Sequence, residues 1–210
     1  LIVGAFLFSR GFIKTGLGKR IAYNLISAFG SSSLRLAYAL ALSDLILAPA
    51  TPSNTARVGG VIMPITTSLA KAFGSEPQDG PRKIGSFLMQ SIYQVNTITS
   101  AMFQTSMAGN TLVAALALQS FGIGITWGDW AMAAIVPGII ALIIMPYFIY
   151  KVYPPEIKDA REAQQMIREE LKGLGKISFQ EWVMLGVFIL ALVLWATSQF
   201  TKLDATTVAF

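Results

Sequence analysis

The feature that most constrains this chain is residues 84–120, a run of 37 residues without a charged side chain. As one helix the run would be about 55 Å long, whereas the hydrocarbon core of a bilayer is about 30 Å thick. Only 13% of the whole chain is charged, compared with about 25% in soluble domains. We therefore predict an all-α polytopic membrane protein in which this run tilts or breaks.

The break is expected within residues 104–111, where polar side chains surround Gly109, the only glycine between Ser86 and Ser120. Discontinuous membrane helices carry the binding sites of many transporters. Helix packing through small residues is the alternative for this cluster. Packing is also the role that we assign to most of the polar residues earlier in the run, which are Gln90, Gln94, Asn96 and Thr97.

A second polar stretch, residues 51–57 (Thr-Pro-Ser-Asn-Thr-Ala-Arg), separates two apolar arms at residues 34–50 and 56–73. Polar groups at membrane depth are tolerated only where protein or a water-filled cavity satisfies them. Such residues therefore point to a functional site. Prolines on both sides of the polar tip favour one re-entrant hairpin over two ordinary spanning helices.

Ser53, Asn54 and Thr55 carry the chemistry of this tip. Their hydroxyl and amide groups can donate to a carboxylate or offer oxygen atoms to a small cation. The first turn of the second arm adds backbone N–H groups, which suit an anion. The simpler alternative is that Ser53 only caps the helix that follows, and capping also fits the functional geometry.

Arg57 and Asp44 are the charged residues closest to the tip in the sequence. Three roles stay open for Arg57: contact with an anionic substrate, an ion pair with Asp44, or extension of its side chain to water. Asp44 lies inside an apolar arm, where a carboxylate has to be paired or protonated. We expect a structural pair in preference to a proton relay.

The candidate substrate-binding residues come from both polar stretches and are Ser53, Asn54, Thr55, Arg57, Thr105, Asn110 and Thr111. A sodium ion is the one cofactor considered, and its site would use Ser53, Asn54, Gly109 and Asn110. No other metal is expected, because the chain has no Cys and no His, and His is the commonest metal ligand.

The same composition argues against an enzyme. A membrane hydrolase could use Ser53 as its nucleophile, but it would lack a histidine base, and Lys71 is about a full hairpin arm away. No phosphate loop or nucleophile elbow is present. A purely structural membrane protein is the remaining alternative, and it would tolerate alanine at Ser53, Asn54 and Thr55.

The pattern of apolar, polar and charged residues divides the chain into six segments. The first contains an amphipathic helix over residues 10–29, which we expect to lie in the membrane interface. Tryptophan and tyrosine side chains mark the predicted interfaces of the later spanning helices: Trp127, Trp130, Tyr147, Tyr150, Trp182 and Trp195. The segments are a scaffold-helix end plus interfacial arm (1–32), the re-entrant hairpin (33–73), a broken transmembrane helix (74–120), a transmembrane helix (121–151), a linker with a short helix (152–180) and the first helix of a second repeat (181–210).

Basic residues orient this arrangement. Fourteen of the sixteen Lys and Arg residues fall on one side, Lys202 falls on the other, and Arg57 lies in the tip. The positive-inside rule makes the first side cytoplasmic or stromal, together with the ends of the hairpin arms and the linker. The net charge of +5 therefore reflects topology, and no nucleic-acid partner is expected.

Residues 41–60, with the sequence ALSDLILAPATPSNTARVGG, resemble the divalent anion/sodium symporter family. Residues 14–22, KTGLGKRIA, are similar as well. Within that family the chain looks most like bacterial citrate/succinate antiporters and plastid 2-oxoglutarate/malate translocators. The resemblance covers most of the 210 residues.

This resemblance implies two inverted repeats, each with a re-entrant hairpin that ends in Ser-Asn-Thr, in a homodimer with an elevator mechanism. The chain has one such tip, so it corresponds to most of the first repeat plus one helix of the second. By the same resemblance Ser53, Asn54 and Thr55 bind a dicarboxylate. Gly109 and Asn110 match an unwound loop at the first ion site, and the arm helix links scaffold and transport domains.

Sodium-coupled members of the family place a hydroxyl four residues before the tip serine, where this chain has Pro49. That departure and the charge of Arg57 favour exchange of one dicarboxylate for another. We therefore predict a secondary transporter of di- or tricarboxylates (2-oxoglutarate, malate, succinate or citrate), an antiporter of the bacterial inner membrane or plastid inner envelope. A sodium-coupled dicarboxylate symporter is the alternative.

Overall fold

The computed structural model describes residues 10–197, and in this range every regular element is a helix. The all-α prediction is therefore confirmed. The predicted helix tail at residues 1–9 and the end of the last segment, with Lys202, lie outside the described residues.

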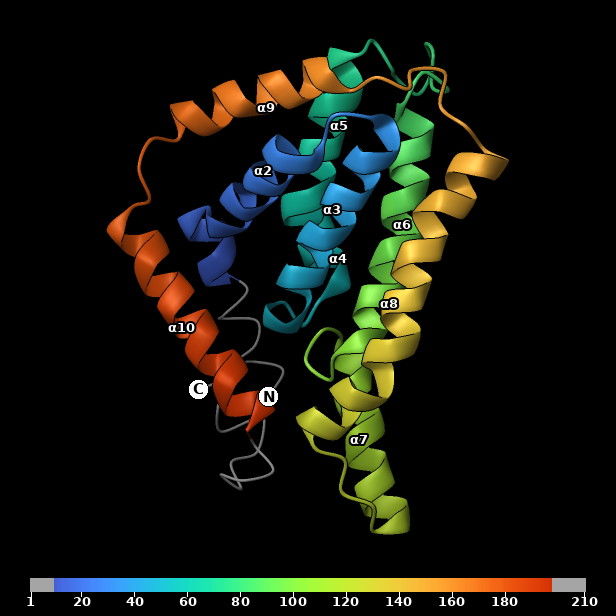
Figure 1. The fold of residues 1–210 in the computed structure, drawn as a ribbon. Coiled ribbons are helices and arrows are strands. Elements are labelled where there is room, and N and C mark those ends of the chain that lie inside the picture. Colours follow the sequence, from blue (N-terminus) through green and yellow to red (C-terminus); the bar gives the residue numbers. More distant parts are fainter. Residues whose placement is uncertain (1–9, 198–210) are drawn as a thin grey trace.

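The labelled helices follow one another along the chain as Figure 1 shows. They are α2 (Leu17–Phe29), α3 (Ser33–Leu47), the 3-10 turn η1 (Ala48–Ala50), α4 (Asn54–Arg57), the π-helix η2 (Val58–Ile62), α5 (Met63–Ala72), α6 (Gly85–Met102), α7 (Ala108–Phe121), α8 (Trp127–Val152), α9 (Arg161–Gly173) and α10 (Phe179–Ala196).

The hairpin is formed by α3 in one direction and by α4, η2 and α5 in the other. Both of its outer ends lie at the end of the molecule that α9 crosses, and its tip lies about half-way along the molecule (Figure 1). Ser32 begins α3 by accepting a hydrogen bond from the backbone N–H of Arg35. The two arms thus form a hairpin, as predicted, with residues 51–53 as its non-helical tip.

The long uncharged run is broken, as predicted. α6 ends at Met102, residues 103–107 are not helical, and α7 begins at Ala108. The break therefore starts one residue earlier and ends four residues earlier than the predicted span, so Gly109 lies in the first turn of α7. Gly138 on α8 allows close packing here, because a Cβ on it would come within 2.6 Å of the Met102 Cγ.

Two amphipathic helices cover the hairpin at its outer end. The predicted interfacial helix over residues 10–29 is not continuous, since Gly16 has a left-handed φ of 79° and separates a first helical piece from α2. α9 is the predicted short linker helix, and it buries Ala163 and Ile167 against the main core. Its Gln164 amide donates to the Ser27 carbonyl of α2 at 2.8 Å.

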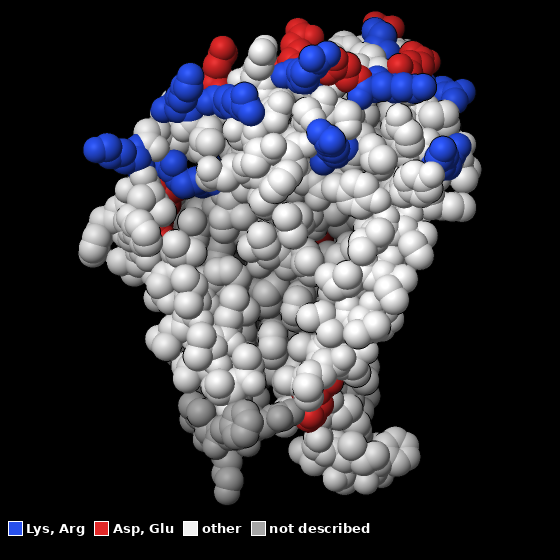
Figure 2. Space-filling model, in the orientation of Figure 1, with Lys and Arg blue, Asp and Glu red and all other residues white. Residues whose placement is uncertain are grey.

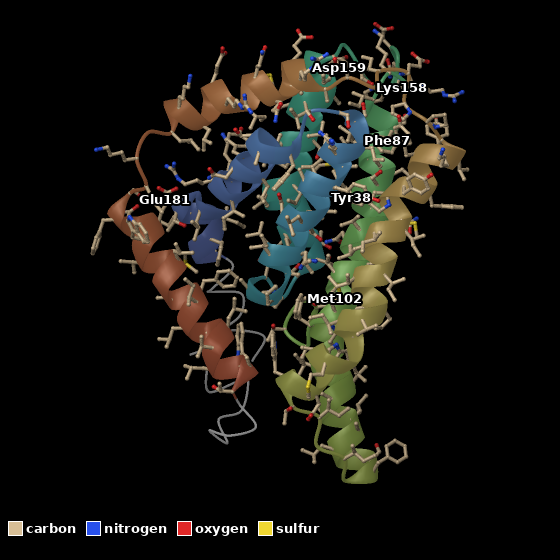
Figure 3. All side chains as sticks on the ribbon, in the orientation of Figure 1. Tyr38, Phe87, Met102, Lys158, Asp159 and Glu181 are labelled. Atoms are coloured by element: carbon tan, nitrogen blue, oxygen red, sulfur yellow. The ribbon has the colours of Figure 1, made fainter. Side chains whose placement is uncertain are left out.

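Arg20 of α2 joins three elements. Its Nε donates to Glu181 Oε1 at 2.6 Å, and its remaining N–H groups face the carbonyls of Leu174, Gly175 and Lys176, just after α9. Glu181 lies at the start of α10 on the side of α2 (Figure 3). The arm helix, the end of the linker and the last helix are therefore tied at one point.

Between residues 10 and 197, three helical stretches are long and apolar enough to cross a membrane: Ser33–Ala50, Trp127–Val152 and Phe179–Ala196. The first is mostly buried inside the protein, as an arm of the hairpin, whereas the other two expose most of their apolar side chains. Lys and Arg side chains gather at the end that α9 crosses, above a largely uncharged body (Figure 2).

Candidate functional site

The hairpin tip begins with a backbone that proline and serine shape locally. Pro49 lies in η1, and Thr51 and Ser53 are both extended. The Ser53 Oγ accepts a hydrogen bond from the Ala56 N–H at 3.2 Å, and its carbonyl accepts from the Arg57 N–H at 2.9 Å. Ser53 thus caps the second arm, which is the simpler of its two predicted roles.

Capping leaves donors available at the tip. Asn54 Oδ1 accepts from the Thr55 N–H at 2.9 Å, which fixes the amide group over the first turn. Its Nδ2 has no hydrogen-bond partner among the described residues. Ser53 and Asn54 are half-buried, and Thr55 is exposed. The tip can therefore donate from the Asn54 amide and the Ser53 hydroxyl, and from the Thr55 hydroxyl if it gives up its long contact with Asn54 Oδ1 at 3.5 Å.

Hydrogen bonds from two nearby side chains, those of Asn110 and Ser106, close the break between α6 and α7. Asn110 Nδ2 donates to the carbonyls of Ser100 and Phe103 at 2.7 and 2.9 Å. The Ser106 hydroxyl lies 2.6 and 2.7 Å from the same two carbonyl oxygens. Because these carbonyls have lost their helical partners, the two side chains satisfy them inside the protein.

Thr105 connects the break to the tip. Its hydroxyl donates to the Pro49 carbonyl at 2.8 Å and accepts from the Trp127 Nε1–H at 3.0 Å. Trp127 in turn stacks between Phe103 and Trp195, with ring centroids 5.7 and 6.1 Å away. Trp127 is 7% exposed and Trp195 2%, so these two side chains pack against protein, which the sequence did not predict.

Arg57 is buried between the two loops, with 1% of the residue exposed. Its Nε donates to Asp44 Oδ1 at 2.8 Å. One terminal nitrogen donates to the carbonyls of Thr51 and Ser106 at 3.1 and 3.3 Å. The other donates to the hydroxyl groups of Thr99 and Ser100, both at 3.1 Å, so all five donors are used.

The ion pair with Asp44 is therefore the alternative that the structure adopts for Arg57. Direct contact between the Arg57 guanidinium and a substrate would require one of these five bonds to break. The second Asp44 oxygen accepts from the Thr99 hydroxyl and, at 3.4 Å, from the Asn96 amide. The carboxylate and the guanidinium are thus both paired and hydrogen-bonded, which a charge in a dry interior requires.

The structure brings the two predicted polar stretches together, because Arg57 and Thr105 bridge them (Figure 1). Ser53, Asn54 and Thr55 lie at the accessible edge of the tip, and Gly109 and Thr111 are half-buried in the first turn of α7. The Thr111 hydroxyl donates to the Ala108 carbonyl of its own helix.

Three residues of this network were missed by the sequence reasoning: Thr99, Ser100 and Trp127. A signal was present for the first two, since Thr99 and Ser100 follow Asn96 by three and four residues and so share one face of α6 with it. Asn96, assigned above to helix packing, joins α6 to α3 through its contact with Asp44. Nothing in the sequence distinguishes the buried Trp127 from an interfacial tryptophan.

The electrostatics of this region favour an anion. The second hairpin arm and α7 both begin at the depth of the tip, and helix N-termini carry partial positive charge. No side chain caps α7, so its first N–H groups stay available apart from Asn110, whose N–H donates to Met107. The Asp44–Arg57 pair is neutral as a unit, so it does not cancel this field.

The profile of the sodium:sulfate symporter transmembrane region matches residues 1–210, the whole chain. The chain belongs to the sodium:sulfate symporter family. This confirms the predicted resemblance to divalent anion/sodium symporters. The family is one of integral membrane transporters and not of enzymes, which confirms that prediction as well.

Three relatives illustrate this membership in the sodium:sulfate symporter family. The chain is 54% identical over 210 residues to the putative malate transporter YflS of Bacillus subtilis. It is 47% identical over 210 residues to the chloroplastic dicarboxylate transporter 1 of Spinacia oleracea, and 39% identical over 196 residues to the citrate/succinate antiporter of Escherichia coli. The matches cover 100%, 100% and 93% of this chain but 44%, 37% and 40% of the relatives, so the chain spans less than half of their length.

Proposed function

We propose that the protein containing this chain is a secondary transporter of di- or tricarboxylates and that the chain supplies one half of its binding site. The observation that carries this proposal is the junction of the hairpin tip and the broken helix through Arg57 and Thr105. The junction leaves polar donors of Ser53, Asn54 and Thr55 at the accessible edge of an otherwise apolar body. The printed names of the relatives, a malate transporter, dicarboxylate transporters and a citrate/succinate antiporter, support the same substrate class.

In this proposal Ser53, Asn54 and Thr55 donate to a substrate carboxylate. The first turn of α7, which contains Asn110 and Thr111, would act on the same anion through its N-terminal partial charge, because the side chains of both residues donate within the protein. Arg57 and Thr105 act behind these residues, since the hydrogen-bonding groups of both are engaged within the protein. A second hairpin tip, from the part of the protein beyond this chain, would hold the other half of the substrate.

We propose exchange in preference to sodium coupling. A sodium ion among Ser53, Asn54, Gly109 and Asn110 would draw on oxygen atoms of the tip and the break. The Thr51 and Ser106 carbonyls, one from each loop, already accept from Arg57. Pro49 adds no hydroxyl oxygen. An exchanger needs no coupling ion, because a bound substrate is present in both directions of the cycle.

We further propose that the protein works as a homodimer by an elevator motion, in the bacterial inner membrane or the plastid inner envelope. The end rich in Lys and Arg faces the cytoplasm or stroma by the positive-inside rule. Under this orientation both outer ends of the hairpin and the α9 linker lie on that side.

The test is exchange by the full-length protein in liposomes. Liposomes loaded with unlabelled malate should take up labelled malate or succinate, and empty liposomes should not. Ser53→Ala, Asn54→Ala and Thr55→Ala should each reduce uptake at least about tenfold, since lost hydrogen bonds to a charged group are worth about 1.5–3 kcal/mol. Thr67→Ala, in the outer part of the second arm, is the matched hydroxyl control and should retain uptake.

The other readings give distinct results. Uptake that follows a sodium gradient into liposomes without internal dicarboxylate would select the sodium-coupled symporter. Full activity in all three tip variants would instead leave the tip with a purely structural role and would reject the proposed site.

A further inference from the structure

Asp44 is buried inside the protein, and it is bound to the residue that spans the two loops of the site. It is 1% exposed and lies on the first hairpin arm, 13 residues before Arg57. Its Oδ1 accepts from the Arg57 Nε at 2.8 Å. Because the five N–H donors of arginine form one rigid fork, this contact at Nε restricts the directions in which the two terminal nitrogens can point.

We infer that Asp44 is a positioning residue of the proposed transport site, which acts by aiming Arg57 at the carbonyls of the tip and the break. This inference rests on the proposed function. With Nε held by Asp44, one terminal nitrogen reaches the Thr51 carbonyl of the tip and the Ser106 carbonyl of the break at 3.1 and 3.3 Å. One side chain thus sets the separation between two loops that are 55 residues apart in sequence, counted from 51 to 106.

Asp44 is itself fixed from the opposite side. Its Oδ2 accepts from the Thr99 hydroxyl and from the Asn96 amide, both on α6. The carboxylate is therefore anchored to the helix that leads into the break, while its own backbone belongs to the hairpin. Any shift of the hairpin against α6 has to change the direction of the Arg57 fork.

Lysine could not take over this task. A lysine ammonium offers three donors around one point, whereas the guanidinium makes five bonds to acceptors on α3, the tip, α6 and the break. Arg57→Lys would keep the charge and the pair with Asp44 but would lose the simultaneous contacts with Thr51 and Ser106. Charge and positioning can therefore be separated by experiment.

A purely stabilising ion pair is the competing explanation, and a neutral double variant distinguishes the two. Removing one partner leaves a buried charge without its counter-charge, which destabilises strongly, whereas replacing both partners is often close to neutral. Asp44→Asn combined with Arg57→Gln should therefore recover thermal stability relative to Asp44→Asn alone. It should not recover the bridge between the Thr51 and Ser106 carbonyls.

The experiment uses the full-length protein in malate-loaded liposomes and measures KM and kcat for labelled malate. Asp44→Asn, Arg57→Lys and the double variant should each raise KM at least about tenfold, the equivalent of about 1.4 kcal/mol, with a much smaller change in kcat. Ser43→Ala is the control, because this buried neighbour of Asp44 donates only to the Ala39 carbonyl of its own helix. Its KM should equal that of the wild type.

A double variant with recovered stability and a wild-type KM would overturn the inference, whether or not Asp44→Asn alone folds. A second measurement does not depend on transport. Amide hydrogen exchange of the double variant should accelerate together at residues 51–53 and 103–107, and unchanged exchange at either loop would also overturn the inference. Absence of exchange transport by the wild type would reject the proposed function instead.

Discussion

Asn110 provides the sharpest test of how the broken helix is held. Its side-chain amide donates to the carbonyls of Ser100 and Phe103 at 2.7 and 2.9 Å, across the gap between α6 and α7. The residue is 5% exposed, so water does not readily replace these bonds. Asn110→Ala removes both donors at once, while Ser106 continues to donate near the same carbonyls.

The size of the effect follows from these contacts. A net contribution of about 0.5–1.5 kcal/mol for each hydrogen bond gives about 1–3 kcal/mol for the two. Since about 1.4 kcal/mol corresponds to a factor of ten, local opening of the break should become about 5- to 150-fold more frequent. Asn110→Asp should have a larger effect, because a carboxyl group of the same shape offers at most one donor and turns an acceptor oxygen toward a buried carbonyl.

Hydrogen exchange of the full-length protein measures this opening directly, since protection reports the free energy of local unfolding. Exchange at residues 103–107 should accelerate in both variants, and more in Asn110→Asp than in Asn110→Ala. Ser91→Ala is the control, because this buried α6 hydroxyl donates only to the Phe87 carbonyl one turn earlier. Exchange of Asn110→Ala within about twofold of the wild type, or slower exchange in Asn110→Asp than in Asn110→Ala, would refute the assignment of Asn110 as the closure of the break.

Two further predictions concern the linker side of the molecule. Arg20→Met removes the donors that hold the carbonyls after α9 and leaves the nearly buried Glu181 without its cation, so trypsin should cleave after Lys176 at least about tenfold faster. Glu181→Gln in the same protein should recover thermal stability but not protection, because the contacts of Arg20 with the linker stay lost. An unchanged cleavage rate in Arg20→Met would show that the contact does not hold the linker. Hydrogen bonds from Arg161 lower the pKa of Asp159 from 3.8 to about 2. Because the folded-state pKa is depressed, the stabilisation is present above pH 3.8 and is lost as the pH falls toward 2. Protection from hydrogen exchange in the first turn of α9 should therefore fall in that pH window. Asp159→Asn should abolish this dependence of protection on pH.

The amino-acid sequence by itself determined the helices, the hairpin and the break. Apolar runs of bilayer length dictate helices, because a helix satisfies its own backbone polar groups. The polar tip shaped by Pro49 and capped by Ser53, and the cluster around Gly109, are local signals, and the helices end close to both. The ends of the break differ from the predicted ones: it falls at residues 103–107 and not at 104–111, because Asn110 turns back to close it from inside α7.

Only the tertiary structure decided which polar groups face a ligand and which face one another. Arg57 offered three roles in the sequence, and its pairing with Asp44 depends on Thr99 of α6, 42 residues away in sequence from Arg57. Trp127 is a spanning-helix tryptophan by pattern, but it is buried against Phe103 because α8 packs beside the break. The physical reason is the same for both: sequence periodicity reports the face of a helix, whereas a buried charge or indole N–H is satisfied by partners that only the packing of distant segments supplies.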